Sequence, residues 1–535
     1  MNEELEKIKK GLIEDLERRV DDKILEPSNA NLLGKLICKA ESSNEAITIL
    51  QLGTTYKKTG LHYDKRLEKQ TNDIKYFKKN DELSFSDGTN SIPHKLIIGD
   101  NYDALRNLLI QYRGLVDVIY IDPPYGKDSM GEFAKTNYEN TISRDNLLSM
   151  LYPRLVLAKQ LLAPEGIIFC SIDDRNHAYV KCLFDDVFQE NNFEGQIHWR
   201  RRHNQPNDKT KLIGIVAEHI LAYSKDIKYH KEFGVGKVKI TGKFTNPDND
   251  PRGPWASKPW KTGENQGGSV YTITSPTGKI FNEEWMGDEN TYKQLLDDKR
   301  IYFPNKGNGA PRKKYYKNER EEEGQCASNW WPHDLFGCNQ DATDELKSIF
   351  GGETPFDNPK PTKLIKALIN LGTIKNEAII LDFFAGSGTT AHAVNELNQE
   401  GCNHHCILCQ MNETTEDNPH GIALDVTAPR LKRIMTGSCY NKSDKYPFYS
   451  GENDFPWLKN NEIYGGSLDV YEIESVSDSE HVSGKTAFDV IDETLYGKAK
   501  FEKLENKIQW VCEHFEFTEK AVETEKEWIN RIERK

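Results

Sequence analysis

The 535-residue sequence predicts an α/β protein built on a doubly wound sheet, and three observations carry that prediction. Apolar, β-branched runs occur at residues 116–121, 166–172 and 378–381, as expected of buried parallel strands. Stretches with a helical spacing of apolar residues separate these runs. Acidic residues, prolines or glycines follow the runs at their carboxyl ends, where open α/β sheets place their ligands.

Length and composition indicate a large soluble protein of roughly two to four domains. No apolar run approaches the roughly 20 residues of a membrane span, and the N-terminus lacks a signal-peptide core. The ten cysteines are scattered along the chain, which favours reduced thiols in a cytoplasm over disulfides. We therefore expect a cytoplasmic protein that does not bind a membrane.

Residues 1–90 are predicted to form a helical N-terminal extension. One apolar stripe with helical spacing stands out among the charges there. It consists of Leu5, Ile8, Leu12, Ile13 and Leu16. Residues 80–91 are polar and contain Gly88, which predicts a loop.

Residues 91–229 are predicted to form the first part of an α/β domain. Strands are expected at residues 95–99, 116–121 and 166–172. Helices are expected to run through Leu109, over residues 144–162 and up to about Phe188.

The remaining chain divides into three segments. Residues 230–350 are rich in Gly, Pro, Asn, Lys, Trp and Tyr and show no helical spacing, which predicts an inserted, mainly β domain. The α/β pattern resumes over residues 351–440, where Pro361 opens a helix and residues 406–409 form a further strand. Residues 441–535 are mixed and predict no particular structure.

Asp122, Pro123, Pro124 and Tyr125 follow the strand at residues 116–121 directly. The two prolines stop the strand and restrict the backbone. An acid and an aromatic ring fixed at a sheet edge suit the holding of a flat, amine-bearing ring, because the carboxylate accepts hydrogen bonds from the amine and the aromatic ring stacks. Alone, these residues also fit a proline-rich strand terminator.

The loop at residues 382–388 connects a strand to a helix that starts at Thr389, as in nucleotide-type binding turns. Gly386 and Gly388 leave room for a ligand to approach the backbone and the helix N-terminus. The loop lacks the third glycine of a dinucleotide site and the Gly-Lys-[Ser/Thr] of a phosphate loop, which disfavours phosphate binding. Such turns also close ordinary strand–helix units.

Together the two motifs resemble the catalytic and S-adenosylmethionine loops of N6-adenine DNA methyltransferases. The catalytic loop comes first and the cofactor loop last, which is the permuted, β-type order. The resemblance covers roughly residues 95–226 and 356–437. Four flanking stretches look like the modification subunits of type III restriction–modification systems: residues 99–105, 152–155, 171–174 and 359–364.

This resemblance implies a Rossmann-like, S-adenosylmethionine-dependent methyltransferase fold with target recognition in the insert. It implies an enzyme that methylates N6 of a flipped adenine at specific sites in double-stranded DNA. It further implies a homodimer and a restriction helicase–nuclease subunit as partner, in a prokaryotic cytoplasm.

The resemblance also implies residue roles. Asp122 and the carbonyl of Pro123 would accept hydrogen bonds from the adenine amine, Pro124 would stiffen the loop and Tyr125 would stack on the base. Near the methionine half of the cofactor it implies Asp382, Phe384, Gly386, Gly388, Thr389 and Thr390. Near the adenosine end it implies Asp100 and Asn101. In the helical motif it implies Lys360, Pro361 and Leu364.

Two roles stay open at this point. Many relatives carry an acid for the ribose hydroxyls after the strand that follows the cofactor loop, whereas this chain has Gln410 there and Glu413 three residues later. Either Gln410 or Glu413 could accept the hydrogen bond from the ribose. Asp100 and Thr390 suit helix capping as well as cofactor binding.

Two stretches suggest metals, yet we expect no metal site. Cys406 and Cys409 fall on a predicted strand at odd separation and so point to opposite faces, which opposes one tetrahedral zinc site. The same stretch also contains Cys402, His404 and His405. Asp173 and Asp174 suit loop capping or hydrogen bonds near DNA, since methyl transfer needs no metal.

Positive charge gathers between residues 198 and 320, with 24 Lys and Arg against 14 Asp and Glu, although the whole chain carries −13. Cations interleaved with aromatics suit phosphate contacts, and a solvated basic surface would look similar. The candidate DNA contacts are Arg200, Arg201, Arg202, Arg252, Lys258, Lys261, Arg312, Lys313 and Lys314.

Other functions stay open as alternatives. A solitary adenine methyltransferase without a restriction partner shares some of the flanking stretches. A non-catalytic DNA-specificity subunit is opposed by the intact Asp122 and glycine loop. Cytosine-N4 enzymes usually begin the tetrapeptide with Ser, and enzymes acting on RNA or protein glutamine with Asn, so Asp122 favours adenine in DNA.

Overall fold

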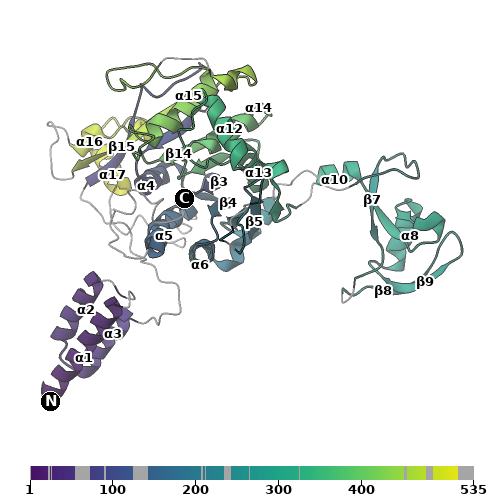
Figure 1. Cartoon of the computed structure of the whole chain (residues 1–535), viewed down its shortest axis with the longest axis horizontal. Helices are drawn as coiled ribbons and strands as arrows, with labels where there is room; N and C mark the ends of the chain where they lie inside the picture. Colours follow the sequence, from purple (N-terminus) through teal and green to yellow (C-terminus); the bar gives the residue numbers. More distant parts are fainter. Residues whose placement is uncertain are drawn as a thin grey trace. The chain divides into compact units, whose positions relative to one another are not determined.

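The computed structural model describes residues 2–21, 25, 27–54, 73–88, 92–124, 143–205, 209–210, 212–233, 243–263, 266–323, 326–450, 455–477 and 486–515. The chain forms two compact units (Figure 1). The larger unit joins Met1–Val235 to Asn329–Lys535, and the smaller unit is Gly236–Ser328.

A ten-stranded sheet forms the centre of the larger unit, in the order β1-β15-β2-β14-β13-β3-β4-β6-β5-β12. Its strands are β1 (Asp73–Lys79), β2 (His94–Ile98), β3 (Val116–Ile121), β4 (Leu162–Ile172), β5 (Phe193–Arg200), β6 (Ala217–Ser224), β12 (Trp330–Trp331), β13 (Ile379–Asp382), β14 (His405–Gln410) and β15 (Leu468–Ser477). The strands from β15 to β4 in this order are parallel, while β1 and β6 run antiparallel to their neighbours.

Helices cover both faces of this sheet. The helices are α4 (Asn101–Tyr112), α5 (Ser143–Leu161), α6 (His177–Phe188), α7 (Ile227–Phe233), α11 (His333–Phe336), α12 (Asn339–Ile349), α13 (Thr362–Gly372), α14 (Thr389–Gln399) and α15 (Ala428–Thr436). Ile119 packs in the core with residues of α4, α5 and α6, whereas Val118 approaches Gly372 of α13. Because successive side chains of a strand alternate, these helices lie on opposite faces. The predicted doubly wound α/β fold is confirmed.

The order of the strands creates a topological switch point between β13 and β3. From β13 the chain continues through α14 to β14 on one side, and from β3 it continues through α5 to β4 on the other. Ligands of open α/β sheets bind where neighbouring strands diverge in this way, at their carboxyl ends. The fold therefore places the expected ligand site after Ile121 and Asp382.

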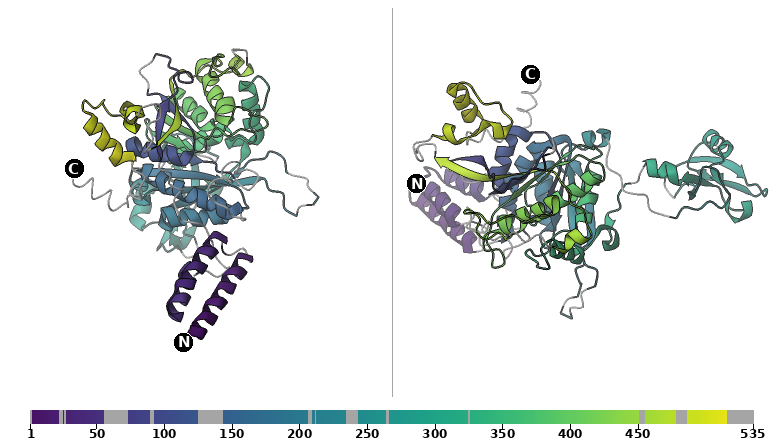
Figure 2. Two further views of the ribbon diagram at one scale, coloured as in Figure 1. Left: turned by 90° about the vertical axis from the view of Figure 1, so that its left-hand side faces the viewer. Right: turned by 90° about the horizontal axis from the view of Figure 1, so that it is seen from above.

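The N-terminal region is helical only in part. Helices α1 (Asn2–Asp21), α2 (Pro27–Lys39) and α3 (Ser43–Thr54) lie side by side (Figure 2). They pack around Leu16 and Ile37, and the partly buried Leu12 and Ile13 of the predicted stripe join them. Residues 73–79, which fall inside the predicted helical extension of residues 1–90, form β1 instead. The cause is tertiary, because β1 pairs along its whole length with the distant β15.

The C-terminal region contributes a strand near the edge of the sheet at which β1 lies. Strand β15 lies between β1 and β2, and α16 (Ala487–Val490) and α17 (Leu504–Phe515) follow it. Trp510 and Val511 of α17 are buried in the core of the larger unit. Among the helices of the described residues, none is long and apolar enough to cross a membrane.

The smaller unit has its own sheets and its own core. Its elements are β7 (Trp255–Pro259), β8 (Ser269–Thr274), β9 (Ile280–Trp285), α8 (Glu289–Asp297), β10 (Ile301–Tyr302), α9 (Pro304–Gly307), β11 (Arg312–Tyr316) and α10 (Lys317–Glu323). Trp260, Ile273 and Trp285 are buried at its centre. The unit is shorter than the predicted 230–350 insert, because β12 after Ser328 pairs with β5 of the larger unit.

Candidate active site

Asp122 and Asp382 come together at the switch point. Strands β3 and β13 are neighbours, with Val118 opposite Ile380 and Ile119 opposite Leu381. Asp122 follows β3 directly and Asp382 ends β13. Burial is the main cause of the raised pKa of Asp382, and the negative charge of Asp122 raises it further, so the two carboxyl groups lie close enough to interact.

Asp122 is ion-paired in this structure. The Lys360 ammonium lies 2.7 Å from Asp122 Oδ2 and 2.9 Å from Glu218 Oε1 of β6. Burial alone would lower the pKa of Lys360, but the charges of Asp122 and Glu218 hold it above its usual value. Pro123 is buried and Pro124 is half-buried beside this pair. Tyr125, the last residue of the predicted tetrapeptide, lies outside the described residues.

Asp382 is buried and bound by neutral donors. The Thr390 hydroxyl donates to its Oδ2 at 2.5 Å, and the Phe384 amide donates to its Oδ1 at 3.0 Å. Burial raises the pKa of Asp382 to about 7, although these two hydrogen bonds act in the opposite direction. Near neutral pH this carboxyl group can therefore change charge when a cation binds beside it.

The glycines of the loop have positions that other residues adopt poorly. Gly386 has φ +51° and Gly388 has φ +80°. A Cβ on Gly386 would lie 3.0 Å from the ring of Phe356, and one on Gly388 would lie 3.3 Å from Thr427 Cγ2. Both the backbone conformation and the close packing thus require glycine here.

Arg430 of α15 and Thr427, the residue directly before α15, hold the glycine loop through hydrogen bonds. The Thr427 hydroxyl donates to the Gly386 carbonyl at 2.7 Å. The buried Arg430 guanidinium donates to Thr389 Oγ1 at 2.9 Å and to Ser387 Oγ at 3.1 Å. Thr389 and Thr390 are themselves buried, so their hydroxyls shape the loop as well as the helix start.

Asp100 and Asn101 also lie at this edge of the sheet. Asp100 caps α4 through the Tyr102 amide at 2.7 Å, as the capping alternative expects. The Arg154 guanidinium bonds Asp100 Oδ1 at 3.0 Å and Asn101 Oδ1 at 2.5 Å. Asn101 in turn donates to the Phe383 carbonyl at 2.7 Å, which links α4 to the glycine loop.

The two candidates for the ribose differ in their contacts. The Gln410 amide oxygen accepts a hydrogen bond from the Gly386 amide at 2.7 Å, and its amide nitrogen donates to the Met411 carbonyl at 3.0 Å. A ribose hydroxyl would therefore have to share or replace a bond that holds the glycine loop. Glu413 is half-buried and remains the other candidate.

Of the three predicted residues at the start of α13, Lys360, Pro361 and Leu364, only Lys360 brings a polar group, its ammonium, to the site. Lys360 and Pro361 precede α13, and Pro361 is buried at the N-cap position of that helix. Leu364 is fully buried inside α13 and belongs to the core.

A family model described as DNA methylase matches residues 116–418, which is more than half of the chain. The chain belongs to the DNA methylase family. A second model, of an uncharacterised conserved protein, matches residues 9–118.

Curated relatives agree with this family. The chain is 34% identical over 359 residues to the type III restriction-modification enzyme StyLTI Mod subunit of Salmonella typhimurium, covering 62% of this chain and 54% of that protein. It is 29% identical over 439 residues to the EcoP15I Mod subunit of Escherichia coli, covering 68% and 66%. It is 32% identical over 365 residues to the type II methyltransferase M.KpnI of Klebsiella pneumoniae, covering 62% and 84%.

The resemblance predicted from the motifs is confirmed, both to DNA methyltransferases and to type III modification subunits. The chain spans 54% and 66% of the two type III subunits named above. Solved structures that resemble it include PvuII DNA methyltransferase (cytosine-N4-specific), at 12% identity and a TM-score of 0.33, covering 60% of this chain and 83% of that one. Another is the M1.HpyAVI–SAM complex, at 14% identity and a TM-score of 0.28, covering 59% and 93%.

In this DNA methylase family member, the basic residues predicted to contact DNA fall into two groups. Arg200 ends β5, and Arg201 and Arg202 follow it. Arg201 pairs with Glu218 at 3.3 Å and, with Arg175 and Arg202, lines a cavity of about 230 Å³. Asp173 and Asp174 line the same cavity. Asp174 also pairs with His219 at 2.7 Å, and Asp173 accepts from the Asn176 amide at 3.2 Å.

In the smaller unit, two of the residues predicted to contact DNA form ion pairs with acidic side chains. Lys314 is buried, with its ammonium on Asp248 and Asp250, and Arg252 pairs with Asp250 at 3.0 Å and with Asp298 at 3.0 Å. These ion pairs oppose a role of Lys314 and Arg252 in DNA contact.

The other predicted basic residues of this unit lie nearer its surface. Lys258 and Lys313 are opposite each other in β7 and β11, with their ammonium groups 5.4 and 5.3 Å from the ring centre of Tyr315. Lys261 pairs with Glu283 at 2.7 Å, and Arg312 donates to Ser257 Oγ at 2.8 Å.

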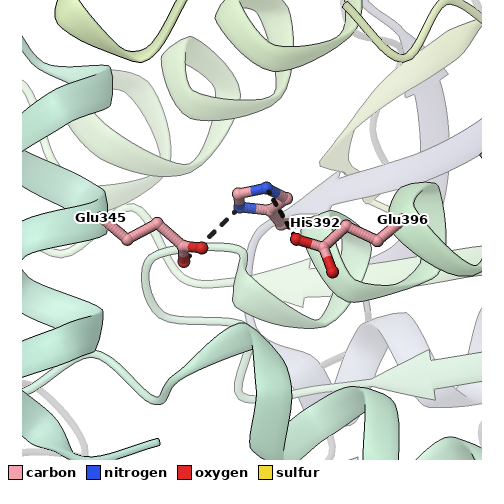
Figure 3. A group of neighbouring side chains, drawn as sticks. All are labelled: Glu345, His392 and Glu396. Carbon is pink, nitrogen blue, oxygen red and sulfur yellow. Dashed lines mark ion pairs between the residues drawn. The ribbon is translucent and has the colours of Figure 1, made fainter. Parts of the chain in front are cut away.

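One cluster of potential metal ligands lies among the described residues: Glu345, His392 and Glu396 (Figure 3). Glu345 Oε2 lies 3.7 Å from Nδ1 of the His392 ring, and Glu396 Oε1 lies 3.9 Å from its Nε2. The Arg430 guanidinium donates to Glu345 at 3.0 Å and lies 2.9 Å from His392 Nδ1. A buried cation thus already balances this cluster, and we assign no metal to it.

Sequence reasoning missed three charged residues that hold the site together: Arg154, Glu218 and Arg430. Arg154 falls in the stretch 152–155 that carries the family resemblance, which is the one available signal for it. Glu218 and Arg430 lie in an ordinary strand and an ordinary helix, and their contacts come from the tertiary fold.

Proposed function

We propose that the protein is a site-specific DNA methyltransferase that transfers a methyl group from S-adenosylmethionine to N6 of a flipped adenine in duplex DNA. The supporting observation is Asp122 at the carboxyl end of β3, beside the glycine loop of β13 at a topological switch point. Family membership agrees with this chemistry.

The catalytic role of the tetrapeptide follows from the chemistry of the amine. The N6 lone pair is delocalised into the adenine ring, so the nitrogen is a poor nucleophile. Asp122 and the Pro123 carbonyl would accept hydrogen bonds from the two N6 hydrogens and stabilise the positive charge that develops on nitrogen. Pro123 and Pro124 hold these acceptors in place, and Tyr125 would stack on the base.

The residues around the glycine loop fit S-adenosylmethionine, which supplies an electrophilic methyl group on a sulfonium. The buried Asp382 carboxyl group, with its pKa raised to about 7 by burial, suits a cationic ligand. The N-terminus of the 11-residue helix α14 suits the cofactor carboxylate. Asp100 and Asn101, linked to the loop through Phe383, are proposed for the adenosine end.

Adenine is proposed over cytosine because Asp, rather than Ser, begins the tetrapeptide. Target recognition is proposed for the smaller unit and for Arg200, Arg201 and Arg202 of the larger one. The smaller unit offers two cations, Lys258 and Lys313, and a stacking surface, the aromatic ring of Tyr315. Lys261 and Arg312 are further candidates for phosphate contacts.

The chain is proposed to act as the modification subunit of a type III system, as a homodimer beside a restriction helicase–nuclease subunit, in a prokaryotic cytoplasm. The named Mod relatives support that assignment. A solitary adenine methyltransferase without a restriction partner is the second candidate, because the chain also covers 84% of M.KpnI, which is named a methyltransferase and not a Mod subunit. Copurification with a helicase-sized partner would favour the first candidate.

The test combines purified protein, S-adenosylmethionine with a labelled methyl group and unmodified genomic DNA, followed by single-molecule mapping of modified bases. Methylated adenine at one recurring sequence is expected. Asp122→Ala should lower transfer by about 100- to 1,000-fold while cofactor binding persists. Transfer to cytosine, to RNA or to no acceptor would contradict the proposal, as would an active Asp122→Ala variant.

A further inference from the structure

The ammonium of Lys360 is shared between two carboxylates at the active site. It lies 2.7 Å from Asp122 Oδ2 and 2.9 Å from Glu218 Oε1, and the Lys360 side chain is only 9% exposed. A buried ammonium is costly unless charged partners compensate for its lost hydration. The raised pKa of Lys360, held up by Asp122 and Glu218 against the effect of burial, indicates that it stays charged.

Glu218 is the more deeply buried partner, with its side chain 2% exposed. Its second oxygen, Oε2, accepts a hydrogen bond from Arg201 at 3.3 Å. Glu218 belongs to β6, which pairs with β4 and β5 within the sheet. The position of Lys360 is therefore set by a rigid strand, whereas Asp122 lies at the start of a loop.

We propose that Lys360 is a positioning residue that, anchored by Glu218, fixes the orientation and negative charge of Asp122, and that it does not hold the cofactor. This inference rests on the proposed adenine methyl transfer. Family resemblance alone would assign Lys360 to the cofactor, whereas its ammonium lies at ion-pair distance from Asp122 and Glu218 in the structure.

The physical reason is the crowding of negative charge at this edge. An ammonium at ion-pair distance favours the charged form of a carboxyl group and restrains its rotation. An anionic, oriented Asp122 is what the hydrogen bonds to N6 require. Asp122 interacts electrostatically with Lys360, Asp382 of β13, Tyr120 of β3 and Cys170 of β4, and Glu218 of β6 shares the ammonium of Lys360. Among these five, Lys360 supplies the positive charge.

The chain offers a matched control at the other end of β3. The Lys375 ammonium lies 2.5 Å from Asp117 Oδ1 and 2.7 Å from Glu165 Oε1. Lys375 thus also shares its ammonium between two carboxylates. One of them, Asp117, belongs to β3, but this group lies away from the switch point. Lys375→Met therefore reports what the loss of such a pairing does to the fold alone.

The test compares Lys360→Met, Lys360→Arg and Glu218→Gln with the wild type and Lys375→Met. Cofactor dissociation constants are measured by calorimetry, and rates of methyl transfer at saturating cofactor are measured across pH. Lys360→Met should lower the saturated rate about 100-fold, shift the acid limb of its pH profile upward by about one unit and leave the dissociation constant within about twofold. Lys360→Arg should recover part of the rate. Glu218→Gln should also lower the saturated rate, because it removes the anchor of Lys360, but it should not move the acid limb upward, because it also removes a negative charge near Asp122. Lys375→Met should change neither rate nor profile.

Three outcomes would overturn the inference. The first is weaker cofactor binding by Lys360→Met with an unchanged saturated rate, which would make Lys360 a cofactor ligand. The second is an unmoved pH profile in Lys360→Met. The third is an equal effect of Lys375→Met. A wild type that methylates no adenine would refute the proposed function itself and this inference with it, whereas an active wild type with an unaffected Lys360→Met variant refutes the inference alone.

Discussion

At the scale of residues, Asp122 and Asp382 end neighbouring strands in very different surroundings. Asp122 is paired with the Lys360 ammonium, whereas Asp382 is enclosed and bound by a hydroxyl and an amide. The Lys360 ammonium favours a permanent negative charge on Asp122. Burial raises the pKa of Asp382 to about 7. Two residues of one type are thereby suited to two tasks, hydrogen bonding to a base and responding to a cation.

The pKa of Asp382 makes cofactor affinity dependent on pH. Below pH 7 most of the free protein carries a neutral Asp382, and a cationic cofactor favours the charged form, so affinity rises as pH increases through 7. We expect binding about tenfold weaker at pH 6 than at pH 8, with proton release on binding. Titration calorimetry in buffers of different ionisation enthalpy checks both effects. Asp382→Asn should flatten the dependence, and a flat wild-type profile would contradict the assignment.

The site residues that sequence reasoning found are those with a local pattern. Asp122 stands beside two prolines, and Asp382 stands beside two glycines at fixed spacing. Glu218 has no such pattern, because its role arises from the position of β6 beside β4, next to the strand that carries Asp122. Lys360 was predicted as a cofactor residue, but its pairing with Asp122 and Glu218 was not, since ion pairs between distant segments leave no trace in local sequence.

At the scale of elements, the strands that sequence predicted are the apolar ones at the centre of the sheet. Strands β1 and β15 were not predicted, because lysines interrupt one and acids interrupt the other. Their charges are complementary: Lys78 pairs with Glu474 at 2.7 Å, and Lys79 pairs with Asp469 at 2.6 Å. Cross-strand pairs of opposite charge support such strands, and only the paired structure reveals them.

Helix α13 packs closely on the sheet through its last residue, Gly372. A Cβ there would lie 2.8 Å from Ile167 Cγ2, 3.0 Å from the Phe169 ring and 3.1 Å from Val118 Cγ2. Gly372→Ala should therefore reduce the free energy of unfolding by about 1–3 kcal/mol through overpacking. Denaturant titration with an unchanged m-value measures this loss.

Gly34→Ala is the control for this variant. A Cβ on Gly34 of α2 would meet nothing within 4 Å, so the added methyl group should cost no stability. Equal stability of the Gly372→Ala variant and the wild type would show that the helix moves to accommodate the methyl group.

At the scale of the whole molecule, the site lies in the larger compact unit, whereas the proposed recognition residues other than Arg200, Arg201 and Arg202 lie in the smaller one. The smaller unit has its own core around Trp260, Ile273 and Trp285, so the larger unit does not depend on it for burial. Sequence composition indicated this insertion, while its boundary at Ser328 depended on the pairing of β12 with β5.

Replacing residues 236–328 by a short Gly-Ser linker tests this division of labour. The shortened protein should fold and bind S-adenosylmethionine with near-normal affinity but lose site-specific methylation. Its DNA binding should also depend less steeply on salt, because fewer Lys and Arg neutralise phosphates. Calorimetry and base mapping measure these outcomes, and methylation of the same sites by the shortened protein would refute recognition by the smaller unit.

The order of the strands also has a consequence for the protein while it is being synthesised. Ribosomes add about 5–20 residues per second, so the glycine loop after β13 appears roughly tens of seconds after Asp122. Strand β2 waits longer, because its two neighbours, β14 and β15, are completed only at Gln410 and Ser477. A growing chain therefore exposes both edges of β2 and has no complete active site. Under the proposed function, the host's DNA meets a competent enzyme only when nearly the whole chain has left the ribosome.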